Sequence, residues 1–162
     1  MAAQDHTLWA AGGLAVAALA LVALEHAGPA LAPLKRGAAV LFLDVPRRRL
    51  LLLRRGPTDP WRPGWWNLPG GTVEDGETYR EGAIREAVEE SGLTPSSLLP
   101  VYRMEDTGFE MRLYAVTRWT GELQLDHESD AARWVPWDEL HRMRVLPGAV
   151  ESLAVARQRL GV

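Results

Sequence analysis

Three glutamates in one short segment carry the clearest chemical signal in the sequence. Glu86, Glu89 and Glu90 are spaced so that, on a helix, their side chains project from overlapping parts of one face. Like charges at this spacing repel each other, and a divalent cation would remove the repulsion. Hard oxygen ligands without cysteine suit Mg²⁺ or Mn²⁺, which are often shared with substrate phosphates. The spacing therefore indicates metal-assisted chemistry on a phosphate ester or anhydride.

The segment before this helix favours a binding site over the alternative interpretation, an ordinary charged surface. If the helix is considered without its neighbours, an ordinary surface helix is a more common explanation of these glutamates than a metal site. Arg85 would then form ion pairs with Glu81 and Glu89. The preceding range 68–71 reads Leu-Pro-Gly-Gly and leads to Glu77. A glycine pair lets the backbone approach a ligand and leaves carbonyl groups free to face a cation. We therefore expect a glycine bend and the helix to converge on one site.

Residues 71–93 match a known motif at every fixed position. From Gly71, five residues precede Glu77, and seven more precede a stretch that reads Arg-Glu-Ala-Val-Glu-Glu-Ser-Gly-Leu, residues 85–93. This segment resembles the Nudix box, G-x5-E-x7-R-E-U-x-E-E-x-G-U, although Ala87 is smaller than the aliphatic residue usual at U. The flanking ranges 65–71 and 127–140 are also similar to the family. The resemblance to the Nudix hydrolases (MutT-like) covers about residues 36–145.

The resemblance implies a fold, a reaction and a set of site residues. The implied fold is an α/β/α sandwich around a mixed β-sheet. The implied reaction is Mg²⁺-dependent hydrolysis, by water attack on phosphorus, of a pyrophosphate bond in a nucleoside diphosphate linked to another moiety. The residues that match the family's metal ligands are Glu86, Glu89, Glu90 and, through its carbonyl, Gly70. Arg85 and Glu77 match residues that brace the loop against the helix.

The general base is left open between the box helix and a later loop. The resemblance implies that one of the box glutamates, Glu86, Glu89 or Glu90, orients or deprotonates the attacking water, as in some members of the family. Outside the box the candidate is Glu128, which lies in an acidic loop with Asp126, His127 and Asp130. An ordinary solvated acidic loop is the alternative interpretation of that segment.

Substrate recognition is predicted from the residues that lead to the glycine pair. Trp65 and Trp66 would stack on a base, or else form part of the core. The same stretch of sequence before the glycine pair contains Arg54, Arg55 and Arg62. A guanidinium group binds phosphate oxygens through two parallel hydrogen bonds. We therefore expect Arg54 and Arg62, with the two tryptophans, to bind the substrate.

The composition excludes several classes of function. The chain has 162 residues, enough for one ordinary domain. Its 18 Lys and Arg against 21 Asp and Glu give a net charge of -3, so no broad cationic surface is available for duplex nucleic acid. The absence of cysteine excludes disulfides and thiolate metal sites. A small nucleotide-type molecule is the expected partner, and the oligomeric state is left open.

The remaining patterns predict a layered α/β domain that positions these residues. Short apolar runs indicate strands, amphipathic spacing indicates helices, and Gly92 suits the end of the first helix. We expect strands at 38–45, 50–53, 101–103 and 111–119, and helices at 78–91, 137–143 and 149–160.

A hydrophobic segment precedes this domain. All 18 basic residues lie from Lys35 onward, and residues 8–24 carry no charge. A membrane anchor, a cleaved signal peptide and an alanine-rich helix packed on the protein all fit such a segment. The anchor is the expectation we favour, with the domain on the cytoplasmic side because Lys35 and Arg36 follow the segment. The predicted organisation is a hydrophobic N-terminal helix and linker at 1–34 and a Nudix hydrolase domain at 35–162.

An alternative function from a different class remains. A catalytically silent Nudix-like module would bind a nucleotide and act as a scaffold at a membrane. The three glutamates argue against it, because a binding-only domain has no chemical need for all of them.

Overall fold

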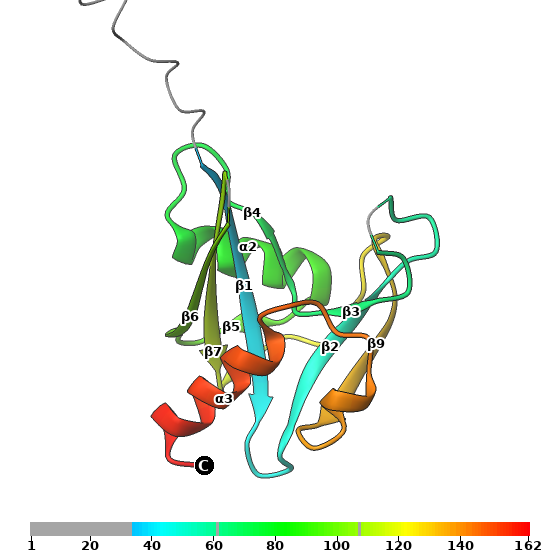
Figure 1. Ribbon diagram of the computed structural model, residues 1–162, viewed down its shortest axis with the longest axis vertical. Coiled ribbons are helices and arrows are strands. Elements are labelled where there is room, and N and C mark those ends of the chain that lie inside the picture. The colour runs from blue at the N-terminus through cyan, green and yellow to red at the C-terminus, as the bar shows by residue number, and fades with distance from the viewer. Residues whose placement is uncertain (1–33, 61, 107) are drawn as a thin grey trace, which may run out of the picture. The chain divides into compact units, whose positions relative to one another are not determined.

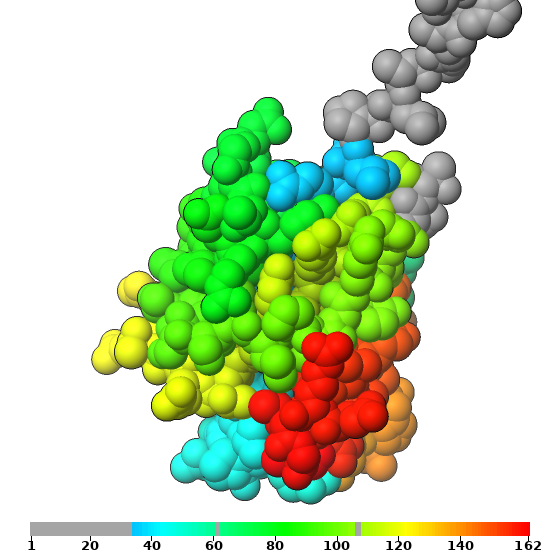
Figure 2. Space-filling model, turned by 90° about the vertical axis from the view of Figure 1, so that its left-hand side faces the viewer, coloured from blue at the N-terminus to red at the C-terminus, as the bar shows by residue number. Residues whose placement is uncertain are grey.

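A mixed β-sheet lies between two helices, α2 (Tyr79–Ser91) and α3 (Ala149–Leu160) (Figure 1). This computed structural model describes residues 34–60, 62–106 and 108–162, and Leu34–Val162 form one compact unit. Figure 2 views the sheet from its β6 edge, with α2 in green and α3 in red on opposite sides of the strands. The predicted α/β/α sandwich is therefore confirmed, whereas the predicted N-terminal helix falls outside the described residues.

The main sheet combines parallel and antiparallel pairs. In the described ranges its strands are β1 (Lys35–Asp44), β2 (Arg49–Arg55), β3 (Trp66–Asn67), β4 (Gly70–Thr72), β6 (Leu99–Asp106), β7 (Phe109–Val116) and β9 (Ser129–Pro136). The order is β3-β2-β1-β7-β6, with β4 paired to β1 and β9 paired to β2. The β1–β7 pair is parallel and the other pairs are antiparallel. A small second sheet pairs β5 (Thr94–Pro95) with β8 (Trp119–Thr120).

Strand β1 is buried on both faces, which explains its nearly continuous apolar sequence. Alternate residues of a strand point to opposite faces of its sheet. Leu41 and its neighbours Ala39 and Leu43 pack in the core cluster that contains residues of α3. Val40 and Phe42 pack in the other cluster, which contains residues of α2. This one strand therefore joins the two halves of the core.

Helix α2 has capping groups at both ends. The Glu81 backbone N–H donates to Thr78 Oγ1 (3.2 Å), and the Thr78 N–H donates to the Glu81 carboxylate (2.8 Å), which forms a capping box. At the other end Gly92 has a φ of 70°, and its N–H donates to the Val88 carbonyl (2.8 Å). Glycine adopts this left-handed conformation without strain. These caps fix the length of the helix that carries the box glutamates.

The glycine pair lies in a strand rather than in the expected bend. Gly70 and Gly71 belong to β4, which runs antiparallel to β1 opposite Ala39 and Ala38. A Cβ at Gly70 would lie only 2.4 Å from the Ala38 carbonyl oxygen and from the Ala39 Cβ. Glycine is required here because two backbones approach closely, and the chain makes no left-handed turn at this point.

The other predicted elements are present with shifted boundaries. The strand expected at 101–103 is the longer β6, and the one expected at 111–119 begins and ends earlier, as β7. The helix expected at 137–143 is only the short 3₁₀ turn Leu140–Arg142. The helix predicted at 149–160 coincides with α3.

Within the described residues, no helix is long and apolar enough to cross a membrane. The segment 8–24, on which the membrane prediction rests, lies outside the described residues.

Candidate active site

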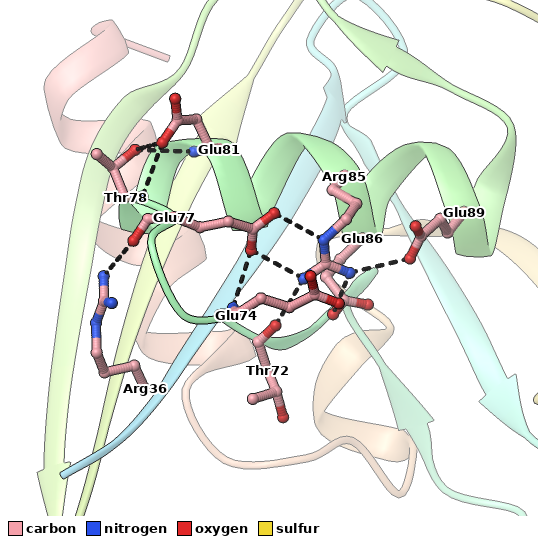
Figure 3. A network of polar contacts seen from close by, with 9 residues as sticks. All are labelled: Arg36, Thr72, Glu74, Glu77, Thr78, Glu81, Arg85, Glu86 and Glu89. Atoms are coloured by element: carbon pink, nitrogen blue, oxygen red, sulfur yellow. Dashed lines mark hydrogen bonds and ion pairs between the residues drawn. The ribbon is translucent and has the colours of Figure 1, made fainter. Parts of the chain in front are cut away.

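Arg85 is the centre of a polar network that joins α2 to the segment before it (Figure 3). Its Nε and Nη2 donate to the two carboxylate oxygens of Glu77 (2.9 and 3.1 Å). Its Nη1 donates to Glu86 (2.9 Å) and Glu89 (3.0 Å), and Nη2 also donates to the Thr72 carbonyl (2.8 Å). A guanidinium group has five N–H donors. Arg85 therefore has an acceptor for each of its donors.

Glu77 extends this network to the loop and to β1. Its carboxylate accepts the backbone N–H of Glu74 (2.9 Å), and its carbonyl accepts Arg36 Nη2 (2.9 Å). The hydrogen bonds from Arg85, and then from the Glu74 backbone, lower the pKa of Glu77. Glu77 thus stays ionised and holds the loop against the helix.

Glu86 lies against Gly71. A Cβ at residue 71 would lie 2.7 Å from the carboxylate atoms of Glu86. The Glu86 side chain is only 14% exposed, and this burial raises its pKa, although Arg85 opposes the shift. The glycine in β4 therefore leaves the space that the Glu86 carboxylate occupies.

Glu90 is the most buried of the three box glutamates. Its residue is 8% exposed, and its carboxylate accepts the backbone N–H of Gly70 (2.9 Å). Burial raises its pKa to about 8, and the negative charges of Glu86, Asp126 and Glu128 act in the same direction. A carboxylate in such surroundings binds either a proton or a cation.

Glu89 completes the group at its exposed side. Its side chain is 56% exposed and shares Arg85 Nη1 with Glu86. Over 34–60, 62–106 and 108–162, no group of three or more acidic or histidine side chains is arranged so that it could hold a metal ion. The arrangement nevertheless fits a hard cation, because burial, and then the neighbouring carboxylates, raise the pKa values of Glu86 and Glu90, and a cation would stabilise their ionised forms.

The acidic loop before β9 faces this group. The negative charge of Glu128 contributes to the raised pKa values of both Glu86 and Glu90. The loop is anchored because the Gly56 N–H donates to the Glu128 carbonyl (2.8 Å) and the Glu128 N–H donates to Asp126 (3.0 Å). The Glu128 residue is exposed. The structure thus brings the predicted base outside the box into electrostatic range of the box glutamates.

A cavity of about 570 Å³ adjoins the glycine strand. Gly70, Gly71 and Thr72 form part of its wall, so the backbone that contacts Glu86 and Glu90 also faces the cavity. The other lining residues come from β1, β2, β3, β6, β7, the segments on either side of β3 and the chain around the start of α3: Ala39, Arg55, Arg62, Asn67, Leu68, Met104, Phe109, Met111, Leu113, Leu146, Pro147 and Ala149. Its volume suits a small organic ligand.

The predicted substrate-binding residues divide into two groups. Arg62 lines the cavity, as does Arg55, and Arg55 also forms an ion pair with Asp59. Arg54 lies outside the lining and binds the Asp130 carboxylate through Nε (2.6 Å) and Nη2 (3.1 Å). The β2–β9 register shifts between Arg54 and Arg55, and such a shift changes where side chains point.

Neither predicted tryptophan lines the cavity. The Arg62 guanidinium lies 4.5 Å from the Trp65 ring centroid, and the Arg54 guanidinium lies 5.9 Å from that of Trp66. Trp66 also packs against the core cluster on the α3 side. The base-stacking role of Trp65 and Trp66 stays a prediction.

Sequence reasoning missed several of the side chains that line the cavity. Asn67, Phe109 and Met111 line it from β3 and β7. Asn67 lies next to the glycine motif, but a single asparagine gives no pattern from which burial can be predicted. Phe109 and Met111 stand two apart on a strand, so the sequence indicates a shared face without identifying a cavity.

Comparison with known proteins assigns the family. The family model described as "NUDIX domain" matches residues 33–155. This match covers most of the chain, so the chain belongs to the Nudix family. Members of the family generally use divalent metal ions.

Two curated relatives and one solved structure illustrate the similarity. A CMP-5'-(N-acetyl-N-hydroxy-3-aminopropyl)phosphonate hydrolase of Streptomyces rubellomurinus is 32% identical over 111 residues, which are 64% of this chain and 52% of the relative. A putative 8-oxo-dGTP diphosphatase of Bacillus subtilis is 31% identical over 103 residues, which are 62% of this chain and 65% of the relative. The chain therefore spans less than two thirds of the length of either relative.

The solved structure supports the fold. The MutT NUDIX hydrolase of Burkholderia pseudomallei superposes with a TM-score of 0.66 at 21% identity, over 76% of this chain and 98% of that chain. The architecture deduced from the strand order and the two core clusters is therefore a Nudix fold.

Proposed function

We propose that this protein is a Mg²⁺- or Mn²⁺-dependent pyrophosphohydrolase that cleaves a nucleoside diphosphate linked to another moiety. The observation that carries the proposal is the position of the glycine strand. On one side Gly70 and Gly71 contact the carboxylates of Glu90 and Glu86, and the same residues line the 570 Å³ cavity. Groups that can hold a cation thus adjoin a space that can hold a substrate.

The three box glutamates and the Gly70 carbonyl would hold the metal. A bound dication neutralises phosphate charge and lowers the pKa of water at the site. Glu86 and Glu90 suit this role because burial and neighbouring carboxylates raise their pKa values, and Arg85 offsets the shift of Glu86 only in part. Arg85 and Glu77 position Glu86 and Glu89 through the hydrogen bonds described above.

A carboxylate next to the phosphate would accept the proton of the attacking water. Glu89 and Glu128 are both exposed, and the negative charge of each acts on Glu86. We propose Glu89 as the base from the box helix and Glu128 as the base from the loop. Both belong to the catalytic set together with Glu86, Arg85 and Glu77.

The nucleotide class is supported by the cavity and by the relatives. Arg62 and Arg55, which is paired with Asp59, place guanidinium groups at the lining, and the remaining lining side chains are largely apolar. Such a site suits a molecule with a charged phosphate part and a flat organic part. The two curated relatives carry names that specify a cytidine nucleotide conjugate and an oxidised deoxyguanosine triphosphate.

The proposal is tested by turnover of a mixed panel of nucleotides with Mg²⁺. The panel contains nucleoside triphosphates, nucleotide sugars, ADP-ribose and dinucleoside polyphosphates, and the products are separated by chromatography. We expect Glu89→Gln and Glu90→Gln to lower kcat at least a hundredfold, because each removes a negative oxygen needed for the cation. Glu74→Gln is the matched control, since Glu74 is exposed on the box loop. Equal rates in all variants, or no turnover of any compound, would contradict the assignment.

A further inference from the structure

Arg36, on strand β1, holds the loop between β4 and α2 at both of its ends. Its carbonyl accepts the backbone N–H of Val73 (2.8 Å), where the loop begins. Its Nη2 donates to the Glu77 carbonyl (2.9 Å), close to the point where the loop meets the helix (Figure 3). Between these two contacts the Glu77 N–H donates to the Glu74 carbonyl (3.1 Å), which closes the loop into a turn. One residue of the sheet therefore fixes where this loop starts and where it ends.

The guanidinium group of Arg36 is supported by an aromatic ring. It lies 4.4 Å from the centroid of the Tyr79 ring, and the Arg112 guanidinium lies 4.0 Å from the same centroid. Arg112 Nε in turn donates to the carboxylate of Glu110 (2.7 Å), a buried residue that is the register partner of Arg36 between β1 and β7. Contact with the first residue of α2 therefore holds the planar group of Arg36 in the orientation that reaches Glu77.

The position of Glu77 matters because its further contacts lead to the box glutamates. The Glu77 carboxylate accepts two hydrogen bonds from Arg85. Arg85 in turn donates to Glu86 and Glu89. Arg36 thus holds the backbone of Glu77, and Arg85 holds its side chain. Loss of the Arg36 contact would let Glu77 shift, and Arg85 with both carboxylates would shift with it.

We infer that Arg36 is a positioning residue of the active site, which raises the affinity for the divalent cation by holding Glu77 and, through it, Arg85. This inference rests on the proposed function, which assigns the cation to the box glutamates. The charge and the position of Arg36 act on that affinity in opposite directions. A positive side chain near an acidic group weakens cation binding through its charge, so loss of the charge alone would strengthen binding. A weaker affinity after removal of the guanidinium group therefore reports lost positioning.

Mn²⁺ binding to the full chain, followed by electron paramagnetic resonance of the free ion, measures this effect without catalysis. Arg36→Met keeps an unbranched side chain without donors, and it should weaken Mn²⁺ binding about tenfold or more, the loss expected for one charge-assisted hydrogen bond. Arg36→Lys keeps a charged donor and should bind Mn²⁺ within about threefold of the wild type.

Lys35→Met is the matched control for the loss of charge. Lys35 is exposed and precedes Arg36 on β1, so its side chain points to the other face of the strand. The variant removes one positive charge next to Arg36 and should bind Mn²⁺ as tightly as the wild type or more tightly. Equal weakening in Lys35→Met and Arg36→Met, or Mn²⁺ binding in Arg36→Met as tight as in the wild type, would overturn the inference.

Amide hydrogen exchange of the metal-free protein separates a displaced loop from a general loss of stability. The amides of Val73, Glu74 and Glu77 each donate a hydrogen bond within the loop that Arg36 holds. In Arg36→Met they should exchange about tenfold faster or more, whereas the amides of α3 should keep their protection. Unchanged exchange in the loop, or an equal acceleration in α3, would contradict the positioning role.

Hydrolysis separates this inference from the proposed function. Turnover of the nucleotide panel by the wild type, with Mn²⁺ affinity unchanged in Arg36→Met, overturns the role of Arg36 alone. Weaker Mn²⁺ binding and faster loop exchange in Arg36→Met, without turnover of any compound by the wild type, overturn the pyrophosphohydrolase alone. If both proposals hold, Arg36→Met raises the Mg²⁺ concentration for half-maximal rate about tenfold and leaves KM for the nucleotide within about twofold.

Discussion

Arg85 donates hydrogen bonds to four different residues of the site. It joins Glu77, Glu86, Glu89 and the Thr72 carbonyl, so it connects the loop with one turn of the helix that carries the box glutamates. A lysine has the same charge but lacks the planar fork of donors. The geometry of the guanidinium group, and not its charge alone, thus positions the carboxylates.

Arg85→Lys should therefore destabilise the fold and impair the site. We expect a loss of about 2–4 kcal/mol in the free energy of unfolding, because several charge-assisted hydrogen bonds disappear. Urea denaturation of the metal-free protein measures this loss. Arg80→Lys is the control, since Arg80 lies on the same helix and donates one hydrogen bond, to the Leu98 carbonyl. Equal effects of the two substitutions would contradict the role given to Arg85.

Glu90 should make the stability of the metal-free protein depend on pH. Burial raises its pKa from 4.5 to about 8 in the folded state. Between these values the folded protein keeps a proton that the unfolded chain releases, so stability falls as pH rises. Its contribution is complete below about pH 4.5 and is lost as pH approaches 8. The expected loss between pH 5 and 8 is about 2–4 kcal/mol.

Thermal unfolding with a chelator present measures this pH dependence. Glu90→Gln should remove most of the slope, because its amide does not titrate. Glu89→Gln should keep the slope, because the Glu89 side chain is 56% exposed. A wild-type stability that rises between pH 5 and 8 would contradict the assignment.

The sequence predicted the residues of the box better than those of the cavity. Helical spacing places Glu86, Glu89 and Glu90 on one face of α2 without reference to the rest of the fold. Asn67 faces the cavity only because β3 pairs with β2 and the chain near residue 145 pairs with β3. Such long-range pairings are not encoded in a local pattern.

At the scale of elements, β4 adjoins both the acidic group and the cavity. Gly71→Ala should disturb the carboxylate side, because its Cβ would collide with Glu86. Gly37→Ala should disturb the cavity side, because its Cβ would collide with Phe109 and Met111. Neither glycine has a left-handed backbone, so each substitution acts through these contacts.

The two glycine variants should therefore have different kinetic effects. Gly71→Ala should raise the Mg²⁺ concentration needed for half-maximal rate at least tenfold and lower kcat. Gly37→Ala should raise KM for the nucleotide and leave the Mg²⁺ dependence within twofold. Steady-state kinetics over both concentrations distinguishes these outcomes. The same kinetic change in both variants would contradict the different roles given to Gly71 and Gly37.

Helices were easier to predict than short strands. The caps Thr78 and Gly92 and the apolar spacing of residues 149–160 have local signatures, and α2 and α3 agree with them. The strand β4 consists of two glycines and a threonine, a composition typical of a turn. It is extended because β1 pairs with it, and a local pattern does not contain that pairing.

At the scale of the whole molecule, we propose that residues 35–162 form the catalytic unit and residues 8–24 attach it to a membrane. The full chain should sediment with membranes, and the chain that begins at Lys35 should remain in the supernatant with kcat/KM within twofold. Fractionation followed by the nucleotide assay tests both statements. Full-length protein in the supernatant without detergent would refute the anchor, and an inactive Lys35–Val162 chain would refute the domain boundary.

The central claim is that Glu86, Glu89 and Glu90 hold a divalent cation beside the glycine strand. Titration of the full chain with Mn²⁺, followed by electron paramagnetic resonance of the free ion, measures this binding directly. The account predicts saturable binding that weakens at least tenfold in Glu86→Gln and Glu90→Gln and is unchanged in Glu74→Gln. Equal Mn²⁺ affinity in the wild type and in all three variants would contradict it.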